Sequence, residues 1–173
     1  MSEKRKQLLT TAEHLFYENG FHHVGLKRIV SDSGVALMTL YNHFPSKEDL
    51  ILEVLKSRET RYLSLLENHS EKSKHEKAKK IVAAHVKWLS KHGNGCMFLR
   101  AKEEFAHVNE AIVRQVEAHK NQMIESFQLS GFTRGEALQL ALLLEGATAL
   151  AEVKKLSEVE RELKKLIEQL YHE

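Results

Sequence analysis

The sequence predicts an all-α protein with about nine helices in total. Leucine, alanine, glutamate and lysine, which are favourable helix formers, are abundant among its 173 residues, and Pro45 is the single proline. Apolar side chains recur at steps of three and four residues along most of the chain, whereas no alternating apolar and polar run has a convincing strand length. These observations favour helices over sheets throughout the sequence.

The first helix is expected over residues 3–19. Its apolar residues fall at helical spacing and form one stripe: Leu8, Ala12, Leu15 and Phe16. The pair Asn19-Gly20 follows the stripe and is a typical stop for a helix. We expect this stripe to face a small core that is shared with the next two helices.

Two short helices follow, separated by a tight turn at Gly34. The first of them is marked by apolar residues at helical spacing: Leu26, Ile29 and Val30. Glycine at position 34 supplies the positive backbone angle that ends one helix and starts a turn. The next helix has one apolar side, predicted to carry Val35, Leu40 and Phe44. Two helices around a glycine turn are the helix-turn-helix arrangement.

The other side of this second short helix combines a thioether, a hydroxyl, a phenol and an amide: Met38, Thr39, Tyr41 and Asn42. Such groups suit a nucleic-acid groove, because amides read base edges and apolar groups contact thymine methyls. A fourth helix is expected to begin after Ser46, with Asp49 three residues later as a capping partner. It is long and continues toward residues 65–66, whereas the charge-rich residues 68–80 predict a solvated turn.

The rest of the chain is more apolar and predicts further helices. One stripe contains Ile81, His85 and Trp88, and another runs through Ile112, Val116, Met123 and Phe127. Thr133 and Glu136 form a capping box before the almost entirely apolar residues 137–151. The last helix has a regular apolar stripe: Val159, Leu163, Leu166, Ile167 and Leu170. We expect the final two helices to dock onto a second copy of the chain.

Composition excludes several classes of protein. The net charge is only +2, and the first 50 residues carry six basic and six acidic side chains, so charge alone does not indicate nucleic-acid binding. No segment has the length of a membrane span or the pattern of a signal peptide, so we expect a cytoplasmic protein without membrane association. The single cysteine, Cys96, excludes an internal disulfide, and neither the 11 histidines nor the carboxylates have the spacing of a metal site.

Residues 6–21 and 26–54, about the first third of the chain, closely resemble the DNA-binding domain of the TetR (tetracycline repressor) family. The matching positions are Ala12, Leu15-Phe16, Gly20-Phe21, Ile29, Gly34-Val35, Thr39-Leu40-Tyr41, His43-Phe44 and Ser46-Lys47-Glu48. The resemblance implies a helix-turn-helix DNA-binding domain over residues 1–47 and a helical effector-binding and dimerisation domain over 48–173. It also implies a dimeric transcriptional regulator, which we expect to be a repressor that a small molecule releases from its operator.

The resemblance implies roles for particular residues. Tyr41 and Lys47 match positions that typically grip phosphates, and Thr39 and His43 match positions that often do so. From the residues themselves, we expect Leu37, Met38 and Asn42 nearest the bases. Two hydroxyl residues that commonly cap the helices of the motif are replaced here by Val24-Gly25 and Ala36, and Lys27 or Arg28 is expected to substitute for their phosphate contacts.

In the family's architecture the C-terminal helices enclose an effector cavity and pair across a twofold axis. The candidates for the cavity are His85, Trp88, Met97, Phe105 and Phe127, each of which is also an ordinary core residue type. A twofold dimer presents its two recognition helices about 34 to 36 Å apart, which matches half-sites in neighbouring major grooves. The partners so implied are duplex operator DNA, a second copy of the chain and an unknown effector, without a cofactor.

The sequence also permits other functions. A helix-turn-helix protein that has lost its hydroxyl caps could act as an interaction protein without binding DNA. A regulator that responds to a metal or through the Cys96 thiol is a further alternative, although a single cysteine has no internal resolving partner. An enzyme is not expected, because the chain has no nucleophile and base pair, glycine-rich phosphate loop or carboxylate metal pattern.

Overall fold

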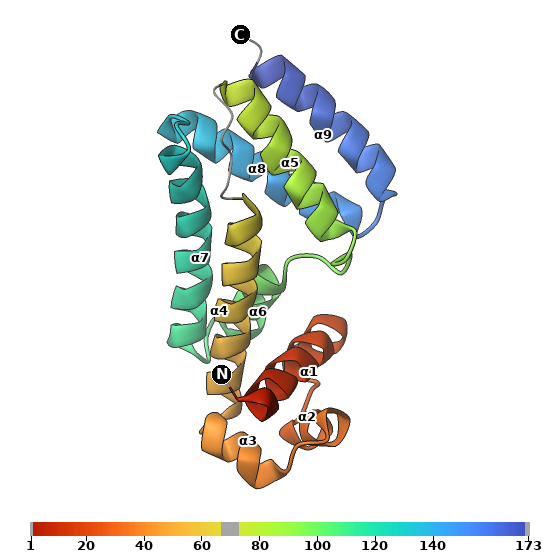
Figure 1. Cartoon of the computed structure of the whole chain (residues 1–173), viewed down its shortest axis with the longest axis vertical. Coiled ribbons are helices and arrows are strands. Elements are labelled where there is room, and N and C mark those ends of the chain that lie inside the picture. Colours follow the sequence, from red (N-terminus) through yellow and green to blue (C-terminus); the bar gives the residue numbers. More distant parts are fainter. Residues whose placement is uncertain (1, 67–72, 172–173) are drawn as a thin grey trace. The chain divides into compact units, whose positions relative to one another are not determined.

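The computed structural model describes residues 2–66 and 73–171, and over these residues it contains nine α-helices and no strand (Figure 1). The predicted all-α class and the predicted number of helices are confirmed for the described part of the chain. None of these helices combines the length with the apolar character that crossing a membrane requires. The chain divides into two compact units, which are described separately below.

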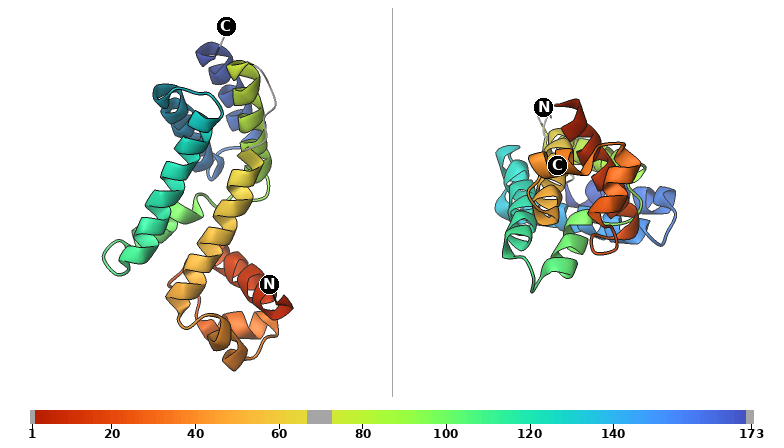
Figure 2. Two further views of the ribbon diagram at one scale, coloured as in Figure 1. Left: turned by 60° about the vertical axis from the view of Figure 1, so that its left-hand side comes forward. Right: turned by 90° about the horizontal axis from the view of Figure 1, so that it is seen from below.

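The first unit contains the N-terminal helices and one later segment, residues 97–118. Its elements are α1 (Glu3–Asn19), α2 (Leu26–Ser33), α3 (Leu37–His43), α4 (Lys47–Leu66) up to Glu59, α6 (Met97–Phe105) and α7 (Glu110–Leu129) up to Ala118. Helices α1, α2 and α3 contact one another and form one cluster in both views of Figure 2. The predicted DNA-binding domain (residues 1–47) and effector-binding domain (48–173) were defined by function and not by contacts. This division therefore stays a prediction.

The core of this unit is built from the residues that the apolar spacing indicated. Leu8, Phe16, Ile29, Leu40 and Phe44 are all essentially inaccessible to solvent. Burial of each such side chain contributes about 1.5 to 3 kcal/mol, so the short helices α2 and α3 are stabilised mainly by packing rather than by their own propensity.

An ion pair inside this unit fixes α4 to α1. The guanidinium of Arg58 on α4 donates to the Glu13 carboxylate on α1 at 2.9 Å, and Arg58 is 3% exposed. The same guanidinium lies 4.7 Å from the centre of the Tyr17 ring. Removal of one partner would leave the other charge buried, so the pair strongly constrains how α1 lies against α4.

The second unit is formed by the remaining helical segments. It contains α4 from Thr60, α5 (Lys74–Leu89), α7 from His119, α8 (Arg134–Ala151) and α9 (Leu156–Leu170). Helices α5, α8 and α9 pack against one another, and α5 and α9 lie side by side in opposite directions (Figures 1 and 2). Their core contains Ile81, Leu163 and Ile167 of the predicted stripes, together with Leu140 and Leu144 from the apolar residues 137–151.

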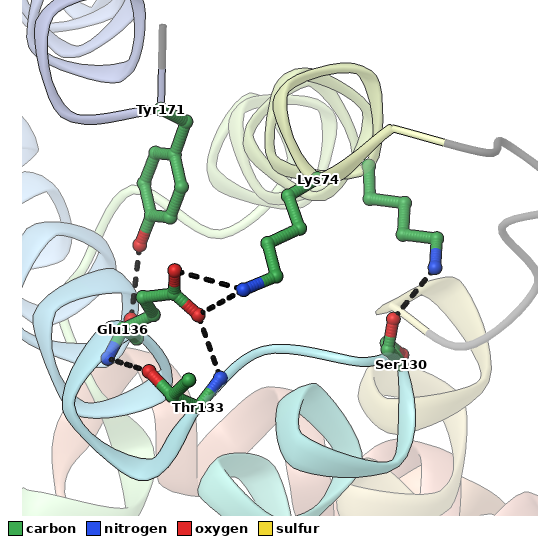
Figure 3. Close-up of polar contacts among 6 residues, drawn as sticks. Lys74, Ser130, Thr133, Glu136 and Tyr171 are labelled. Carbon is green, nitrogen blue, oxygen red and sulfur yellow. Dashed lines mark hydrogen bonds and ion pairs between the residues drawn. The ribbon is translucent and has the colours of Figure 1, made fainter. Parts of the chain in front are cut away.

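The start of α8 joins three helices of the second unit (Figure 3). Thr133 and Glu136 form the predicted capping box, and the Glu136 carboxylate also accepts from Lys74 Nζ on α5 at 2.8 Å. The hydroxyl of Tyr171, directly after α9, donates to the Glu136 carbonyl at 2.9 Å. The hydrogen bond from Lys74 is the main cause of a lowered pKa of Glu136. The capping box is thus also the point that links α8 to α5 and α9.

One local prediction is wrong. The charge-rich residues 68–80 were expected to form a solvated turn, but residues 74–80 are the first turns of α5; residues 68–72 lie outside the described residues. The Ser73 hydroxyl accepts the backbone N–H of Glu76, which caps the helix, and Ala78 is completely buried in the core. Helix capping and burial of one face therefore outweigh the charge of the exposed face.

Candidate nucleic-acid interface

The turn between α2 and α3 has the backbone geometry that the sequence predicted. Gly34 follows α2 with φ of 67° and ψ of 16°, a left-handed conformation that a residue with a Cβ adopts at a cost. Gly25 and Ala36 precede α2 and α3, and neither helix has a side-chain cap. The structure thus confirms that the two hydroxyl caps are missing, while the turn itself is formed.

Helix α3 presents one exposed face. Leu37, Met38, Tyr41 and Asn42 are all exposed, and Met38 is 72% accessible. These positions lie at i, i+1, i+4 and i+5, which places them on one side of a helix. On the opposite side Leu40 is completely buried, and Phe44 is buried directly after the helix. The burial of Leu40 and Phe44 therefore fixes the rotation of α3 about its axis. In this rotation the side chains of the exposed face point into solvent.

Thr39 and His43 lie at the margin of this face, because both are half-buried. His43 Nε2 is 3.3 Å from the Ser2 hydroxyl oxygen, which also accepts the backbone N–H of Arg5 as the cap of α1. The His43 side chain is thus in hydrogen-bond contact with the residue that caps α1. The imidazole can still meet a phosphate through Nδ1, but Nε2 has a partner within the protein.

Two N-terminal residues support α3 and were not predicted from the sequence. Ser2 contacts His43, and the guanidinium of Arg5 lies 5.2 Å from the centre of the Phe44 ring. Arg5 also donates to the Glu53 carboxylate on α4. These contacts join residues separated by 39 to 48 positions in the chain, and no local pattern in the sequence indicates them.

Cationic residues flank α3 at the starts of two helices. Lys27 and Arg28 are exposed in the first turn of α2, where Arg28 lies 3.8 Å from Asp32. Lys47 is the first residue of α4 and is half-buried, with Nζ 6.0 Å from the centre of the Phe16 ring. Burial lowers the pKa of Lys47, against the opposing charges of Glu48 and Glu104. Both positions suit contacts with a phosphate backbone at a helix start.

The predicted effector residues are divided between the two units. His85, Trp88 and Phe127 belong to the second unit, whereas Met97 and Phe105 belong to the first. His85, Met97, Phe105 and Phe127 are buried, and Trp88 is half-buried. Tyr62, which the sequence did not single out, connects two of them, because its ring centre is 5.9 Å from that of His85 and 5.3 Å from that of Trp88.

His85 is the centre of a buried hydrogen-bond network within the second unit. Its Nδ1 lies 2.8 Å from the Tyr62 hydroxyl on α4, and its Nε2 lies 3.1 Å from the Thr148 hydroxyl on α8. The Thr148 hydroxyl donates to the Leu144 carbonyl, so it accepts from Nε2–H, and Nδ1 then accepts from Tyr62. One neutral imidazole on α5 thereby connects α4 and α8.

Burial governs the protonation of this network. It lowers the pKa of His85 to about 4, with a further lowering by the charge of Lys120 and an opposing contribution from the Leu144 carbonyl. Burial also raises the pKa of Tyr62 well above its usual range. Both groups are therefore neutral near pH 7, in agreement with the hydrogen bonds that they make.

Neither the histidines nor the cysteine form a metal centre in the described ranges 2–66 and 73–171, where no group of three or more potential ligands is present. Cys96 is a free, half-buried thiol. Lys120 Nζ lies 3.4 Å from its sulfur and pairs with the Glu145 carboxylate at 2.6 Å. His85 and His119 are buried within the second unit.

The last two helices leave an apolar groove open to solvent. This groove between α8 and α9 has a volume of about 530 Å³, and Leu142, Ala147, Leu150, Val159 and Leu166 are among the residues that line it. Leu142 is 64% exposed and Leu150 is 52% exposed. Charged residues of both signs surround the groove: Lys154, Glu158, Arg161 and Glu162.

Comparison with known proteins identifies relatives of the N-terminal segment. Residues 8–54 match the family described as "Bacterial regulatory proteins, tetR family". The chain is 43% identical over 53 residues to the HTH-type transcriptional activator FasR of Mycolicibacterium smegmatis, and 38% identical over 60 residues to the HTH-type transcriptional regulator UidR of Escherichia coli. The aligned segments cover 31% and 35% of this chain but only 24% and 31% of those relatives.

Solved structures extend the similarity to the whole chain. A TetR-family transcriptional regulator from Streptomyces coelicolor is 28% identical, with a TM-score of 0.86 over 98% of this chain and 94% of that one. A TetR transcriptional regulator from Legionella pneumophila is 23% identical, with a TM-score of 0.81 over 99% and 98% of the two chains. The similarity to the Legionella protein concerns the fold alone. The similarity to the Streptomyces protein also agrees with the family match of residues 8–54.

Proposed function

Because this chain is a member of the TetR family of bacterial regulatory proteins, we propose that it is a dimeric, sequence-specific DNA-binding transcriptional regulator. Members of this family are regulators rather than enzymes. We further propose that it represses transcription and leaves its operator when a small molecule binds. One matched relative is named an activator and another a regulator, so the direction of control is decided by experiment.

The exposed face of α3 is the observation that carries the proposal. Leu40 and Phe44 are buried and fix the rotation of the helix, while Met38, Tyr41 and Asn42 are exposed together. A helix held in this way can enter a major groove, where its side chains reach base edges. In this proposal Leu37, Met38 and Asn42 read bases, and Asn42 favours adenine.

Residues around this face would hold the phosphate backbone. Tyr41 and Lys47 are the main candidates, with Thr39, His43, Lys27 and Arg28 at the margins of α3 and α2. Phosphate contacts position a recognition helix without reading sequence, and each one makes binding more sensitive to salt. Residues 1–50 carry no net charge, so attraction to DNA would depend on where these cations lie rather than on how many there are.

The second copy of the chain would occupy the groove between α8 and α9. Its exposed leucines would otherwise remain in water, and its surrounding charges include both signs. A twofold interface brings the same surface of both copies together, so it requires a self-complementary surface of this kind. A dimer would carry two recognition helices and bind an inverted repeat.

The effector would bind in the second unit near Tyr62, His85 and Trp88, with Phe127 as a further candidate. Aromatic rings and a polar network within an apolar core are typical of sites for small organic molecules. Met97 and Phe105 belong to the first unit, so their part in effector binding stays a prediction from the sequence. The test is thermal unfolding with a metabolite and drug library, because a ligand at about 100 times its dissociation constant adds about 2.7 kcal/mol of stability.

DNA binding itself is tested by a mobility shift with duplexes from the neighbourhood of the chain's own gene. We expect a specific complex whose affinity falls steeply as salt rises from about 50 to 200 mM. Competition with unrelated duplex controls for non-specific binding. A protein that forms a helix-turn-helix but gives no specific complex would instead be an interaction protein.

A further inference from the structure

Helix α6 is bonded directly to the turn between α1 and α2 within the first unit. The Glu104 carboxylate on α6 accepts the backbone N–H of Phe21 at 3.0 Å and that of His22 at 2.7 Å. The His22 ring nitrogen Nε2 lies 2.9 Å from the Glu104 backbone carbonyl, to which it donates. We call this set of three hydrogen bonds the Glu104–turn contact.

Residues around the Glu104–turn contact permit it sterically or add further contacts between α6 and the N-terminal helices. Gly20 has φ of 80°, and a Cβ at this position would lie 3.0 Å from Glu104 Oε1, so glycine serves both the turn and the close approach of the carboxylate. The ring of Phe105 lies against Phe21 and His22, with ring centres 5.9 and 4.8 Å apart. Arg100 on α6 also donates to the Tyr17 carbonyl near the end of α1 at 2.6 Å.

The contact matters because of how the chain connects its two units. The chain passes from one unit to the other at residues 59–60 inside α4, at 96–97 directly before α6, and at 118–119 inside α7. The helices α1 to α3 are joined covalently to the remainder only through α4. The Glu104–turn contact therefore attaches them a second time, to a helix that has its own covalent link to the second unit.

We infer that Glu104 is a positioning residue that fixes α1–α3 against α6 and thereby sets which spacing of operator half-sites the dimer accepts. This inference rests on the proposed function, because spacing has a meaning only for a dimer on DNA. In this proposal the Glu104–turn contact restricts the orientations that α1–α3 adopt relative to α6. Without this contact α1–α3 would sample more orientations relative to α6, and different half-site separations would then be bound with more similar affinity.

A carboxylate is the suitable group for this role. It accepts from two backbone N–H groups at once, and hydrogen bonds to a charged acceptor are shorter and stronger than those between neutral groups. The variant Glu104→Gln has the same size but replaces one acceptor oxygen by an NH₂ group, which would face a backbone donor. The variant Glu103→Gln removes the same charge from the exposed neighbouring position and is the matched control.

The test measures affinity for a series of duplexes in which two identical half-sites are separated by the selected spacer or by one or two base pairs more or less. The wild-type protein and Glu103→Gln should prefer one spacer. In Glu104→Gln the ratio of affinities for the selected spacer and for the altered spacers should fall about tenfold. Its affinity for a duplex with a single half-site should stay unchanged. An unchanged spacer profile, or an equal loss of affinity for all duplexes, would overturn the inference.

A second measurement separates this inference from the proposed function, because it uses the dimer without DNA. A nitroxide label is attached in a Cys96→Ser, Met38→Cys background, since Met38 is exposed on α3, and the distance between the two labels is measured by pulsed electron paramagnetic resonance. Glu104→Gln should broaden the distance distribution and Glu103→Gln should not. Equal widths would contradict the positioning role even if the protein binds DNA, whereas a wild-type protein without specific DNA binding would refute the proposed function alone.

Discussion

Asn42 and Lys47 are expected to perform separable tasks on the DNA interface. The substitution Lys47→Ala should weaken binding similarly for all operator sequences, because a phosphate contact carries no sequence information. It should also reduce the slope of log K against log salt by about 0.9. The substitution Asn42→Ala should instead change the preferred base under α3. Fluorescence anisotropy with a panel of single-base operator variants measures both effects.

The exposed Lys87 on α5 offers a matched control for loss of charge. Lys87→Ala should leave both the salt slope and the sequence preference unchanged. If Asn42→Ala bound the whole panel with the order of preference of the wild-type protein, Asn42 would not read a base. If Lys47→Ala selectively affected a few sequences, its assignment to the phosphate backbone would be wrong.

At the residue scale the sequence predicted the face of α3 but not the long-range contacts that hold α1, α2 and α3 in place. Leu37, Met38, Tyr41 and Asn42 could be placed on one side, because a helix repeats every 3.6 residues and Leu40 needed burial. Ser2 and Glu104 could not be found, since their contacts join residues 41 and 82 to 83 positions apart. Such pairs depend on tertiary packing, which a single sequence does not reveal.

At the scale of helices, His85 makes the stability of the second unit depend on pH. Its folded pKa of about 4 lies below the unfolded value of 6.5, so between these values the unfolded state binds more protons than the native state. The free energy of unfolding is therefore not reduced by this group above about pH 6.5, and it falls as the pH decreases toward 4. From pH 7 to 4.5 this group should remove about 2 to 3 kcal/mol.

Urea unfolding at pH 7 and at pH 4.5 checks this expectation. The variant His85→Gln should be less stable than the wild-type protein at pH 7, because Tyr62 and Thr148 lose a matched partner, but it should lose less additional stability at pH 4.5. His23→Gln, at an exposed position, should show the pH dependence of the wild-type protein. An equal loss in all three proteins would show that His85 is not the responsible group.

Among the elements, the helices were predictable and some of their boundaries were not. Apolar spacing and capping residues located α1, α8 and α9, since these patterns are local. The start of α5 was missed because Lys74 and its neighbours are charged, although Ser73 supplies a cap and one face is buried. Tyr62 was missed for a different reason, because its hydrogen-bond partner His85 lies on another helix, α5.

At the scale of the whole molecule, the groove between α8 and α9 predicts a dimer. Leu142→Glu and Leu150→Glu each place a charge among residues that are expected to become buried between two copies. We expect a shift to the 19.9 kDa monomer in sedimentation equilibrium at micromolar concentration. Operator affinity should fall by about a hundredfold or more, because the two half-sites are then bound independently.

Leu129→Glu is the control for the dimer, because Leu129 is 90% exposed at the end of α7 and does not line this groove. This variant should sediment as the wild-type protein does. A wild-type protein that sediments as a 19.9 kDa monomer would contradict the dimer directly. Dimers that persist in both groove variants would show that the two copies meet on another surface.

The most direct test of DNA recognition by α3 is selection from a fully randomised duplex library with the purified protein. We expect enrichment of an inverted repeat whose half-sites lie on one face of the duplex, with centres about one helical turn or a multiple of it apart. The variant Asn42→Ala should enrich a different half-site. Absence of any enriched sequence at low salt, with the protein folded and dimeric, would contradict the account.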